Sequence, residues 1–460
     1  MKMKMQESSR RVVVTGLGVV SSLGTELTDF WNACRDGRTG VRMATESDAR
    51  PVAALAPVDS FTGVIDDFGR LTGGKARAIR KGVKLMSREI QFGVATAQKA
   101  LNDAMAEELP SERVGVSYAS DYVVSPPFEL TDAMKACSKI GEDGKPRLDF
   151  SLWSAYGLPK MVPTWQLKYL TNMSASHITI YNEFFGPAFD VTNREASFPT
   201  ALAEAVHTIQ SGRADYMIVG ATGSKLHPYR FLDALVNDEI SQDLVRQAPS
   251  EAAIEATRPF DARRRGYAPG EGAGAVFLET AESAIKRGAT IYAEVVGGVS
   301  RAVVKSARDL GESGCDLMTS RDALKDSFAL TLRSLVERFS IDVATLGHIN
   351  ANAVGDLALD SAEALALREL LGDRLEQIPA TSLAGAIGGI GAGAGAIETI
   401  ASLLALKYDE LFPTLNFALS DPDCPTSPLT ALGKPGDSFI KLSGNRVGQT
   451  SAIYVRRFDG

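Results

Sequence analysis

Apolar residues recur along the chain at two spacings, which predict strands and helices in alternation. Continuous apolar runs beside glycines predict buried strands at residues 12–20, 216–220, 274–278 and 291–296, and shorter strands at 348–351 and 451–455. Apolar positions three or four residues apart predict helices over residues 87–105 and 197–211. This alternation predicts an α/β fold in which helices pack against sheets.

One long span lacks either spacing. Residues 126–171 contain several prolines and glycines, and we predict a loop-rich insertion at about residues 121–171. A span of this length without regular structure is usually functional or part of an interface.

Composition narrows the classes of function. The chain has 460 residues, of which 45% are hydrophobic and 23% charged, as in ordinary globular proteins. Its formal net charge of -7 argues against a nucleic-acid partner, and an acidic carrier protein would need a local basic patch on this chain. Gly16 and Gly18 lack the third glycine of a dinucleotide-binding turn.

The four cysteines are scattered, so they predict neither a zinc site nor a disulfide framework. We expect no metal, no cofactor and a reducing cytoplasmic setting. The N-terminus lacks the pattern of a signal peptide, and no apolar run reaches the length of about 18 to 20 residues needed to span a membrane.

The segment at residues 186–197 carries the most information about function. It reads GPAFDVTNREAS and resembles the strand-to-helix turn of β-ketoacyl-acyl-carrier-protein synthases, roughly G-P-x-x-x-[IV]-[ST]-T-A-C-A-[ST]. In that register, Glu195 takes the place of the nucleophilic cysteine. A thiolate attacks thioesters well, whereas a carboxylate would form a labile anhydride. The chain therefore resembles a condensing enzyme whose nucleophile has been replaced.

A second segment makes this resemblance specific. Residues 258–274 read RPFDARRRGYAPGEGAG and depart only at Arg265 from the family pattern R-P-F-D-x-x-R-D-G-[FY]-x-x-G-E-G-A-G. We expect Arg258, Asp261 and Glu271 to form a buried charged brace there. Residues 12–18 and 412–416 also match the family. The resemblance covers nearly the whole chain and implies a thiolase-like five-layered α-β-α-β-α fold, with similar halves at residues 1–260 and 261–460.

The other reactive positions of the family have also changed. Asn352 replaces the first histidine, Ala384 the lysine and Gly389 the second histidine, whereas Glu398 is retained. In a working enzyme of this family the histidines support decarboxylation and stabilise the enolate oxygen. Condensation by this chain alone is therefore not expected.

The glycine-rich loop that gates acyl chains in the family is altered as well. Its pattern G-F-G-G-x-N is replaced by a segment containing Arg446, Val447 and Gly448, which are candidate substrate-binding residues. The four histidines of this chain have no metal-ligand spacing, so we expect structural roles for them.

Glu195 has two readings. It caps the helix that follows, pairs with Arg194 and plugs an unused pocket, or it serves as a carboxylate base or ligand group in an acyl pocket. The first reading is preferred.

Loss of the nucleophile on a retained scaffold resembles the chain-length-factor or ketosynthase-β subunits of type II polyketide systems. Those subunits commonly have glutamine at the cysteine position. The resemblance implies a non-condensing subunit, a pseudoenzyme of fatty acid or polyketide biosynthesis. It would work with an acyl carrier protein and pair with an active ketosynthase or with itself through residues 165–190. Two alternatives stay open: a divergent acyl-thioester enzyme for acyl transfer or hydrolysis that uses Glu195, and a homodimeric acyl-binding protein.

Overall fold

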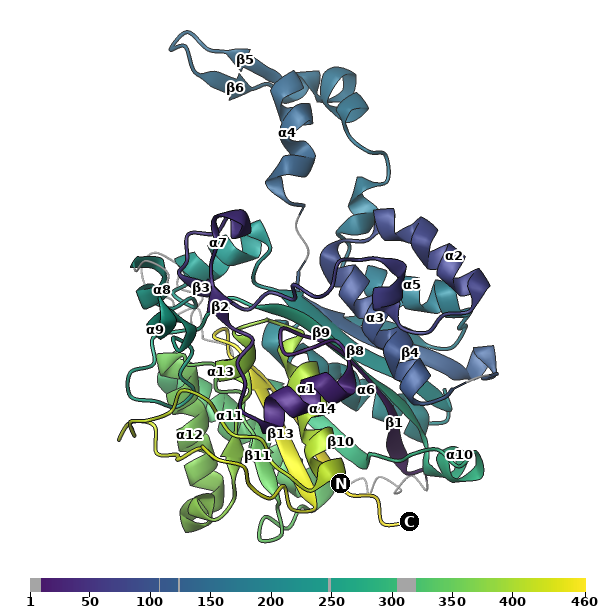
Figure 1. Ribbon diagram of the computed structural model, residues 1–460, viewed down its shortest axis with the longest axis vertical. Helices are drawn as coiled ribbons and strands as arrows, with labels where there is room; N and C mark the ends of the chain where they lie inside the picture. The colour runs from purple at the N-terminus through teal and green to yellow at the C-terminus, as the bar shows by residue number, and fades with distance from the viewer. Residues whose placement is uncertain (1–9, 107, 123–124, 247–249, 304–319) are drawn as a thin grey trace, which may run out of the picture.

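A computed structural model describes residues 10–106, 108–122, 125–246, 250–303 and 320–460. A ten-stranded mixed sheet runs through the body of the molecule in the order β12-β11-β13-β14-β10-β1-β9-β8-β4-β7 (Figure 1). Its strands are β1 (Val12–Val20), β4 (Val114–Ser120), β7 (Ala188–Val191), β8 (Tyr216–Ser224), β9 (Glu271–Thr280), β10 (Ala293–Ala302), β11 (His348–Asn350), β12 (Ala380–Thr381), β13 (Ser438–Gly444) and β14 (Gln449–Arg456). Two small hairpin-like pairs are β2 (Arg42–Met43) with β3 (Ala54–Leu55) and β5 (Ser138–Ile140) with β6 (Pro146–Leu148).

Helices cover both faces of this sheet. They are α1 (Leu27–Arg35), α2 (Gly73–Gly82), α3 (Arg88–Asp103), α4 (Pro127–Ala136), α5 (Met173–Asn182), α6 (Ser197–Gln210), α7 (Pro228–Val236), α8 (Gln242–Arg246), α9 (Glu251–Ile254), α10 (Ala281–Lys286), α11 (Arg321–Phe339), α12 (Leu357–Leu371), α13 (Ala384–Ile387) and α14 (Ala394–Tyr408). Helix α6 contacts β4, β8, β10 and β14, and helix α14 contacts β8, β9 and β13. Helix α3 packs on β1, β8 and β9, and helix α11 packs on β10, β14 and α12. This is the five-layered thiolase-like arrangement that the family resemblance implies.

The predicted regular elements are confirmed. The predicted strands correspond to β1, β8, β9, β10, β11 and β14, and the predicted helices correspond to α3 and α6. Their interior is apolar because β1 is buried along its whole length and α3 and α6 each turn an apolar face to the sheet. None of the helices within the described ranges is long and apolar enough to cross a membrane.

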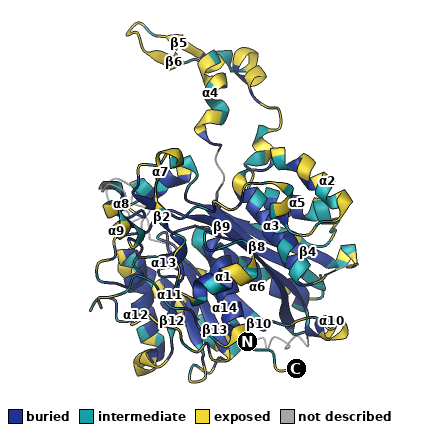
Figure 2. Ribbon diagram, viewed as in Figure 1, coloured by how far each residue is buried: buried dark blue, intermediate teal, exposed yellow. Residues whose placement is uncertain are grey.

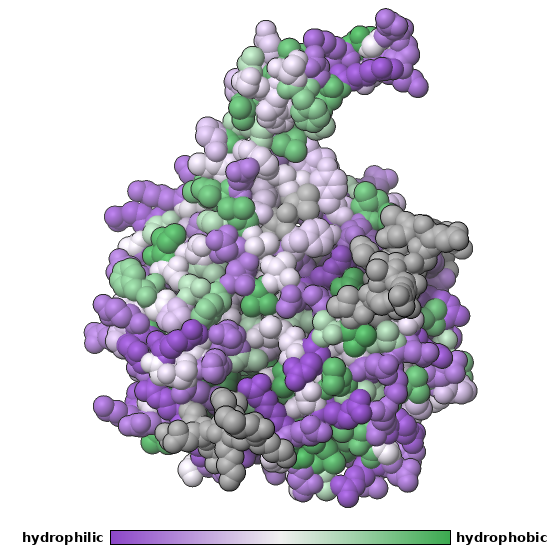
Figure 3. All heavy atoms as spheres, turned by 180° about the vertical axis from the view of Figure 1, so that it is seen from behind, coloured by the Kyte–Doolittle hydropathy of each residue, from purple (hydrophilic) through white to green (hydrophobic). Residues whose placement is uncertain are grey.

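Residues 126–171 form an arm that stands away from the body (Figure 1). Within this predicted loop-rich insertion lie helix α4, the β5–β6 pair and several short helical turns. The arm is largely exposed (Figure 2), and from behind it shows hydrophobic residues between a hydrophilic tip and the body (Figure 3). Its strongly exposed apolar side chains are Phe128, Ile140, Phe150, Tyr156, Leu158 and Val162.

The predicted charged brace is not formed by the expected residues. Asp261 pairs with Arg263 at 2.8 Å, and Glu271 pairs with Arg88 at 2.8 Å. Arg258 joins neither carboxylate, because each one is already satisfied by a nearer arginine. The buried arginine of this segment is Arg264, which donates to Asp421 at 2.7 Å.

Candidate functional site

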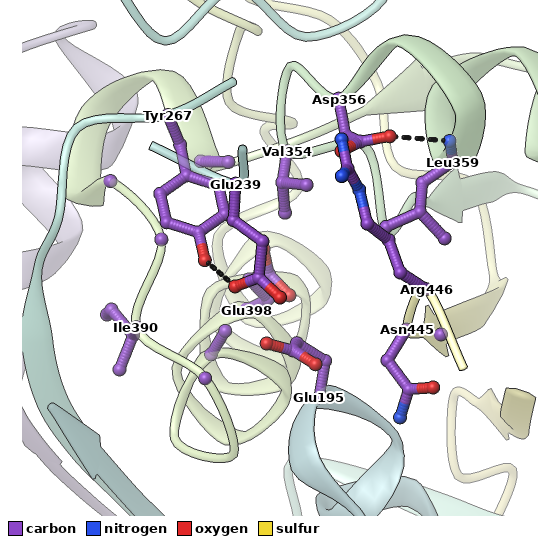
Figure 4. A pocket seen from close by; sticks show the side chains of 16 residues that line it. Glu195, Glu239, Tyr267, Val354, Asp356, Leu359, Ile390, Glu398, Asn445 and Arg446 are labelled. Carbon is purple, nitrogen blue, oxygen red and sulfur yellow. Dashed lines mark hydrogen bonds and ion pairs between the residues drawn. The ribbon is translucent and has the colours of Figure 1, made fainter. Parts of the chain in front are cut away.

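The turn after β7 places Glu195 where the sheet meets helix α6. The chain leaves β7, and Arg194 adopts a left-handed backbone conformation with φ of 50°. The hydroxyl of Ser197 then accepts the backbone N–H of Asn193 at 2.8 Å, which fixes the turn. The Glu195 side chain is 17% exposed and points into a pocket (Figure 4).

The free space inside that pocket is small, about 20 Å³. Its walls are Glu195, Glu239, Tyr267, Val354, Asp356, Leu359, Ala384, Gly388, Gly389, Ile390, Gly391, Ala394, Glu398, Gly444, Asn445 and Arg446. The structure therefore brings Glu195, Ala384, Gly389, Glu398 and Arg446 together around one space, although they lie far apart in the sequence. Asn352, Val447 and Gly448 are not among its walls.

A buried lysine that the sequence analysis missed is the ionic partner of Glu195. The amino group of Lys225, directly after β8, lies 3.5 Å from a Glu195 carboxylate oxygen and 2.9 Å from Glu239. The hydroxyl of Tyr267 donates to Glu239 at 2.5 Å. Glu239 is thus the better-paired carboxylate of this cluster.

The pKa shifts of the two carboxyl groups go in opposite directions. Burial raises the pKa of Glu195, with Glu239 and Asp121 adding repulsion that Lys225 only partly offsets. Burial opposes ionisation of Glu239 as well, but Lys225 and the Tyr267 hydroxyl lower its pKa. Lys225 and Glu239 therefore form the ionised pair, and the environment favours a neutral Glu195.

The expected role of Glu195 as a helix cap is wrong, whereas Arg194 attracts its carboxylate without forming a contact ion pair. Its carboxylate makes no capping hydrogen bond at the start of α6. Arg194 lies 3.5 Å from Asp233 on α7 and 3.5 Å from Glu239, which is itself a wall of the pocket. Glu195 faces the cavity with Lys225 as its ion-pair partner within the described chain.

Asn352 forms hydrogen bonds within the fold and does not line the pocket. Its side-chain oxygen Oδ1 accepts the N–H of Gly444 at 2.9 Å, and its backbone N–H donates to Glu363 at 2.7 Å. The amide nitrogen of its side chain is buried without a partner among the described residues. Burial raises the pKa of Glu363 to about 8.

The space that a histidine would need at position 389 is occupied. A Cβ atom on Gly389 would lie 2.3 Å from the ring of Tyr267, so this position accepts no side chain without rearrangement. The retained Glu398 pairs with a buried lysine from another element. Lys441 on β13 is fully buried and pairs with Glu398 at 2.7 Å.

The altered gate loop is held in place by ion pairs and hydrogen bonds. Arg446 donates to Asp356 at 2.5 Å and to the carbonyl of Asn237 at 2.7 Å. The side chain of Asn445 donates to the carbonyl of Asn193 at 3.2 Å and so ties this loop to the Glu195 turn. Gly448 has φ of 84° in the turn between β13 and β14.

Sequence reasoning missed Lys225, Glu239, Tyr267 and Lys441. A signal for Lys225 and Lys441 is visible afterwards, because each is a lysine within or directly after an apolar strand-like run. Among the described residues, no group of His, Cys, Asp and Glu side chains is arranged to hold a metal ion. Cys34, Cys137 and Cys424 are buried thiols, and the remaining cysteine lies outside the described residues.

The chain is similar to known proteins over nearly its whole length. Residues 9–284 match the beta-ketoacyl synthase N-terminal domain and residues 305–418 match the beta-ketoacyl synthase C-terminal domain. A putative polyketide beta-ketoacyl synthase 1 of Streptomyces virginiae is 30% identical over 97% of this chain and 98% of its own length. The 3-oxoacyl-(acyl-carrier-protein) synthase 2 of Synechocystis sp. is 28% identical over 90% of each chain.

Solved structures of the same fold cover nearly the whole chain. A ketosynthase in complex with a type II polyketide synthase acyl-carrier protein and bound to the hexaketide has a TM-score of 0.77 at 26% identity, covering 98% of this chain and 100% of that chain. The ishigamide ketosynthase/chain length factor has a TM-score of 0.77 at 22% identity, with the same coverage, and supports the fold.

Proposed function

Because this chain belongs to the β-ketoacyl synthase family, we propose that it is a non-condensing subunit of a type II fatty acid or polyketide synthase. It pairs with an active ketosynthase and shapes the space available to the growing acyl chain.

The observation that carries this proposal is the chemistry of the pocket. Glu195 offers no thiol, Ala384 and Gly389 offer no side-chain donor, and Tyr267 fills the space beside Gly389. Removing a single oxyanion-hole donor costs an enzyme about 3 kcal/mol of activation free energy. Here the nucleophile and these donors are absent together, while the fold and the pocket remain.

The edge of the sheet supports pairing with a second subunit. Strand β7 is the last strand of the sheet and pairs with β4 on one side, which leaves its other edge open in the described chain. Beside it, Ile180 is 64% exposed and Phe185 is 71% exposed. An open edge and exposed apolar side chains are the features that another sheet would cover. Ile178, also within the proposed interface, is fully buried and belongs to the core.

A basic surface supports an acidic carrier protein as a further partner. Between Arg70 and Arg88 the sequence has five further cations and no Asp or Glu, although the whole chain carries a net charge of -7. These cations are Lys75, Arg77, Arg80, Lys81 and Lys84 on and directly after α2. A clustered basic surface attracts an acidic partner and orients its approach.

Co-expression with a cysteine-bearing ketosynthase of the same pathway tests the proposal. We expect the two chains to co-purify as a complex, and the products of the ketosynthase to change in chain length when this chain is omitted. A ketosynthase whose assembly and products are unaffected by this chain would contradict the proposal. Replacing the lysines and arginines of α2 with glutamate should weaken carrier binding without disturbing the complex.

One observation favours a second function, thioester chemistry with Glu195 as general base. A carboxylate with a raised pKa that faces a cavity without a hydrogen-bond partner is a candidate acid or base. Hydrolysis or transfer of acyl thioesters that is abolished in Glu195→Gln, with an unchanged melting temperature, would establish this function. Bound lipid in the purified homodimer without turnover would indicate an acyl-binding protein instead.

A further inference from the structure

A second hollow lies behind the Glu195 pocket, at the root of the arm. It is a groove with about 590 Å³ of free space. Its walls come from the start of α3, the arm and the segment after β8, and they include Met86, Glu89, Phe128, Ser224 and Pro228. Because Ser224 directly precedes Lys225, the segment that carries Lys225 toward Glu195 also borders this groove.

A chain of three charged side chains lies between the two hollows. On the pocket side, Asp121 accepts the N–H of Ala392 at 3.1 Å, and a Cβ on Gly391 would lie 2.3 Å from its carboxylate. Gly391 is a wall of the Glu195 pocket, so Asp121 lies directly behind that wall.

Arg230 on α7 continues this chain toward the groove. Its guanidinium group donates to Asp121 at 3.2 Å and to Glu89 at 2.9 Å. Glu89 is itself a wall of the groove. The sequence of contacts from pocket to groove is therefore Asp121, Arg230 and Glu89, and all three side chains are buried.

The charged side chains that separate the pocket from the groove do not suit the passage of an acyl chain. A pocket for an apolar ligand is lined mainly by apolar side chains. Here three charges form the partition, and Lys225 and Glu195 lie beside it. Breaking a buried ion pair by removing one partner is strongly unfavourable, so a methylene chain would not displace Arg230 from its two carboxylates.

We propose that the Asp121–Arg230–Glu89 bridge is a barrier that stops an acyl chain from passing from the Glu195 pocket into the groove beneath the arm. Arg230 is the specificity-determining residue of this barrier. This inference rests on the proposed function: a subunit that performs no condensation keeps its own interior closed, and the acyl chain extends within the active partner.

The test removes the barrier without leaving a buried charge unpaired. The opened variant is Glu89→Ala/Asp121→Asn/Arg230→Ala, in which all three charges are lost together and space is created. The matched filled variant is Glu89→Gln/Asp121→Asn/Arg230→Met, which removes the same charges but keeps the side-chain volume. Circular dichroism and thermal melting establish that both variants are folded before binding is measured.

Binding of pantetheine, octanoyl-pantetheine and dodecanoyl-pantetheine is then measured by titration calorimetry. In the wild type and the filled variant we expect the acyl group to make no difference to affinity. In the opened variant we expect dodecanoyl-pantetheine to bind at least tenfold more tightly than pantetheine, with octanoyl-pantetheine between them. The filled variant also controls for acyl-pantetheine that binds in the groove without passing the barrier. The loss of charge would change that binding equally in both variants.

Three outcomes would overturn the barrier: wild-type binding that strengthens with chain length, a folded opened variant that gains nothing, or a filled variant that gains as much as the opened one. Co-purification with the ketosynthase is measured on the same three proteins. Loss of the barrier should leave that complex intact, so failure of this inference is distinguishable from failure of the proposed function.

Discussion

Replacing Glu195 with glutamine should leave the protein at least as stable as the wild type at alkaline pH. An ion pair at 3.5 Å is worth about 5 kcal/mol at an effective dielectric constant of about 20, and Lys225 supplies this attraction. Burial and the repulsion from Glu239 and Asp121 oppose the ionisation of Glu195. Because the pKa of Glu195 is raised, these unfavourable contributions outweigh the attraction to Lys225. Glutamine keeps the shape and removes this penalty, while Lys225 keeps Glu239 at 2.9 Å.

The effect should depend on pH in a defined direction. A carboxyl group whose folded-state pKa is raised binds more protons in the folded state than in the unfolded state, so the wild type loses stability as pH rises above the unfolded value of about 4.3. Glutamine does not titrate. The stability difference in favour of Glu195→Gln should therefore be near zero at acidic pH and grow to the order of 1 kcal/mol once the pH exceeds the folded-state pKa.

Thermal or urea unfolding of both proteins at pH 5 and pH 8.5 measures this difference. Lys225→Met serves as the contrast, because it removes the nearest cation from the buried, ionised Glu239 and should cost about 3 to 5 kcal/mol. A loss of more than about 2 kcal/mol in Glu195→Gln at pH 8.5 would show that the ionised carboxylate is a required partner, and would refute the reasoning.

Three further predictions concern the surroundings of the pocket and the sheet edge. Lys441→Met should destabilise the fold by about 3 to 5 kcal/mol in urea unfolding, because it leaves Glu398 buried without its partner. Adding Glu398→Gln should recover most of that loss, and no recovery would mean that the two side chains act separately. Gly389→Ala should cost about 1 to 3 kcal/mol through overpacking against a tyrosine ring, and an unchanged melting temperature would contradict the close contact. Ile180→Lys/Phe185→Lys should prevent assembly in light scattering while leaving the melting temperature of the isolated chain nearly unchanged; an intact complex would exclude this edge as the interface.

The sequence predicted the elements that have a clear apolar spacing or match a family motif. Helix α14 was not predicted because it is buried on nearly all sides, so its residues show no alternation of apolar and polar positions. Strand β13 was not predicted because the fully buried Lys441 interrupts its apolar run.

Only the part of the site that lies in family motifs could be predicted from the sequence. The motif register placed Glu195, Ala384 and Gly389 beside one cavity, because those segments match a family pattern. It gave no information on Lys225 or on the bridge through Arg230. Those charges are brought together by the packing of α7 and the segment after β8, and no spacing in the sequence records that packing.

The central claim, that this chain performs no condensation, is tested most directly by carbon–carbon bond formation with acyl- and malonyl-carrier-protein thioesters. The assay uses the purified wild type and Glu195→Cys, prepared free of host synthases, beside an intact ketosynthase and a sample without protein. We expect neither protein to exceed the sample without protein, because a restored thiol would still lack the side chains missing at Ala384 and Gly389. Condensation by the wild type above that background, or by Glu195→Cys at a rate comparable with the intact ketosynthase, would contradict the account.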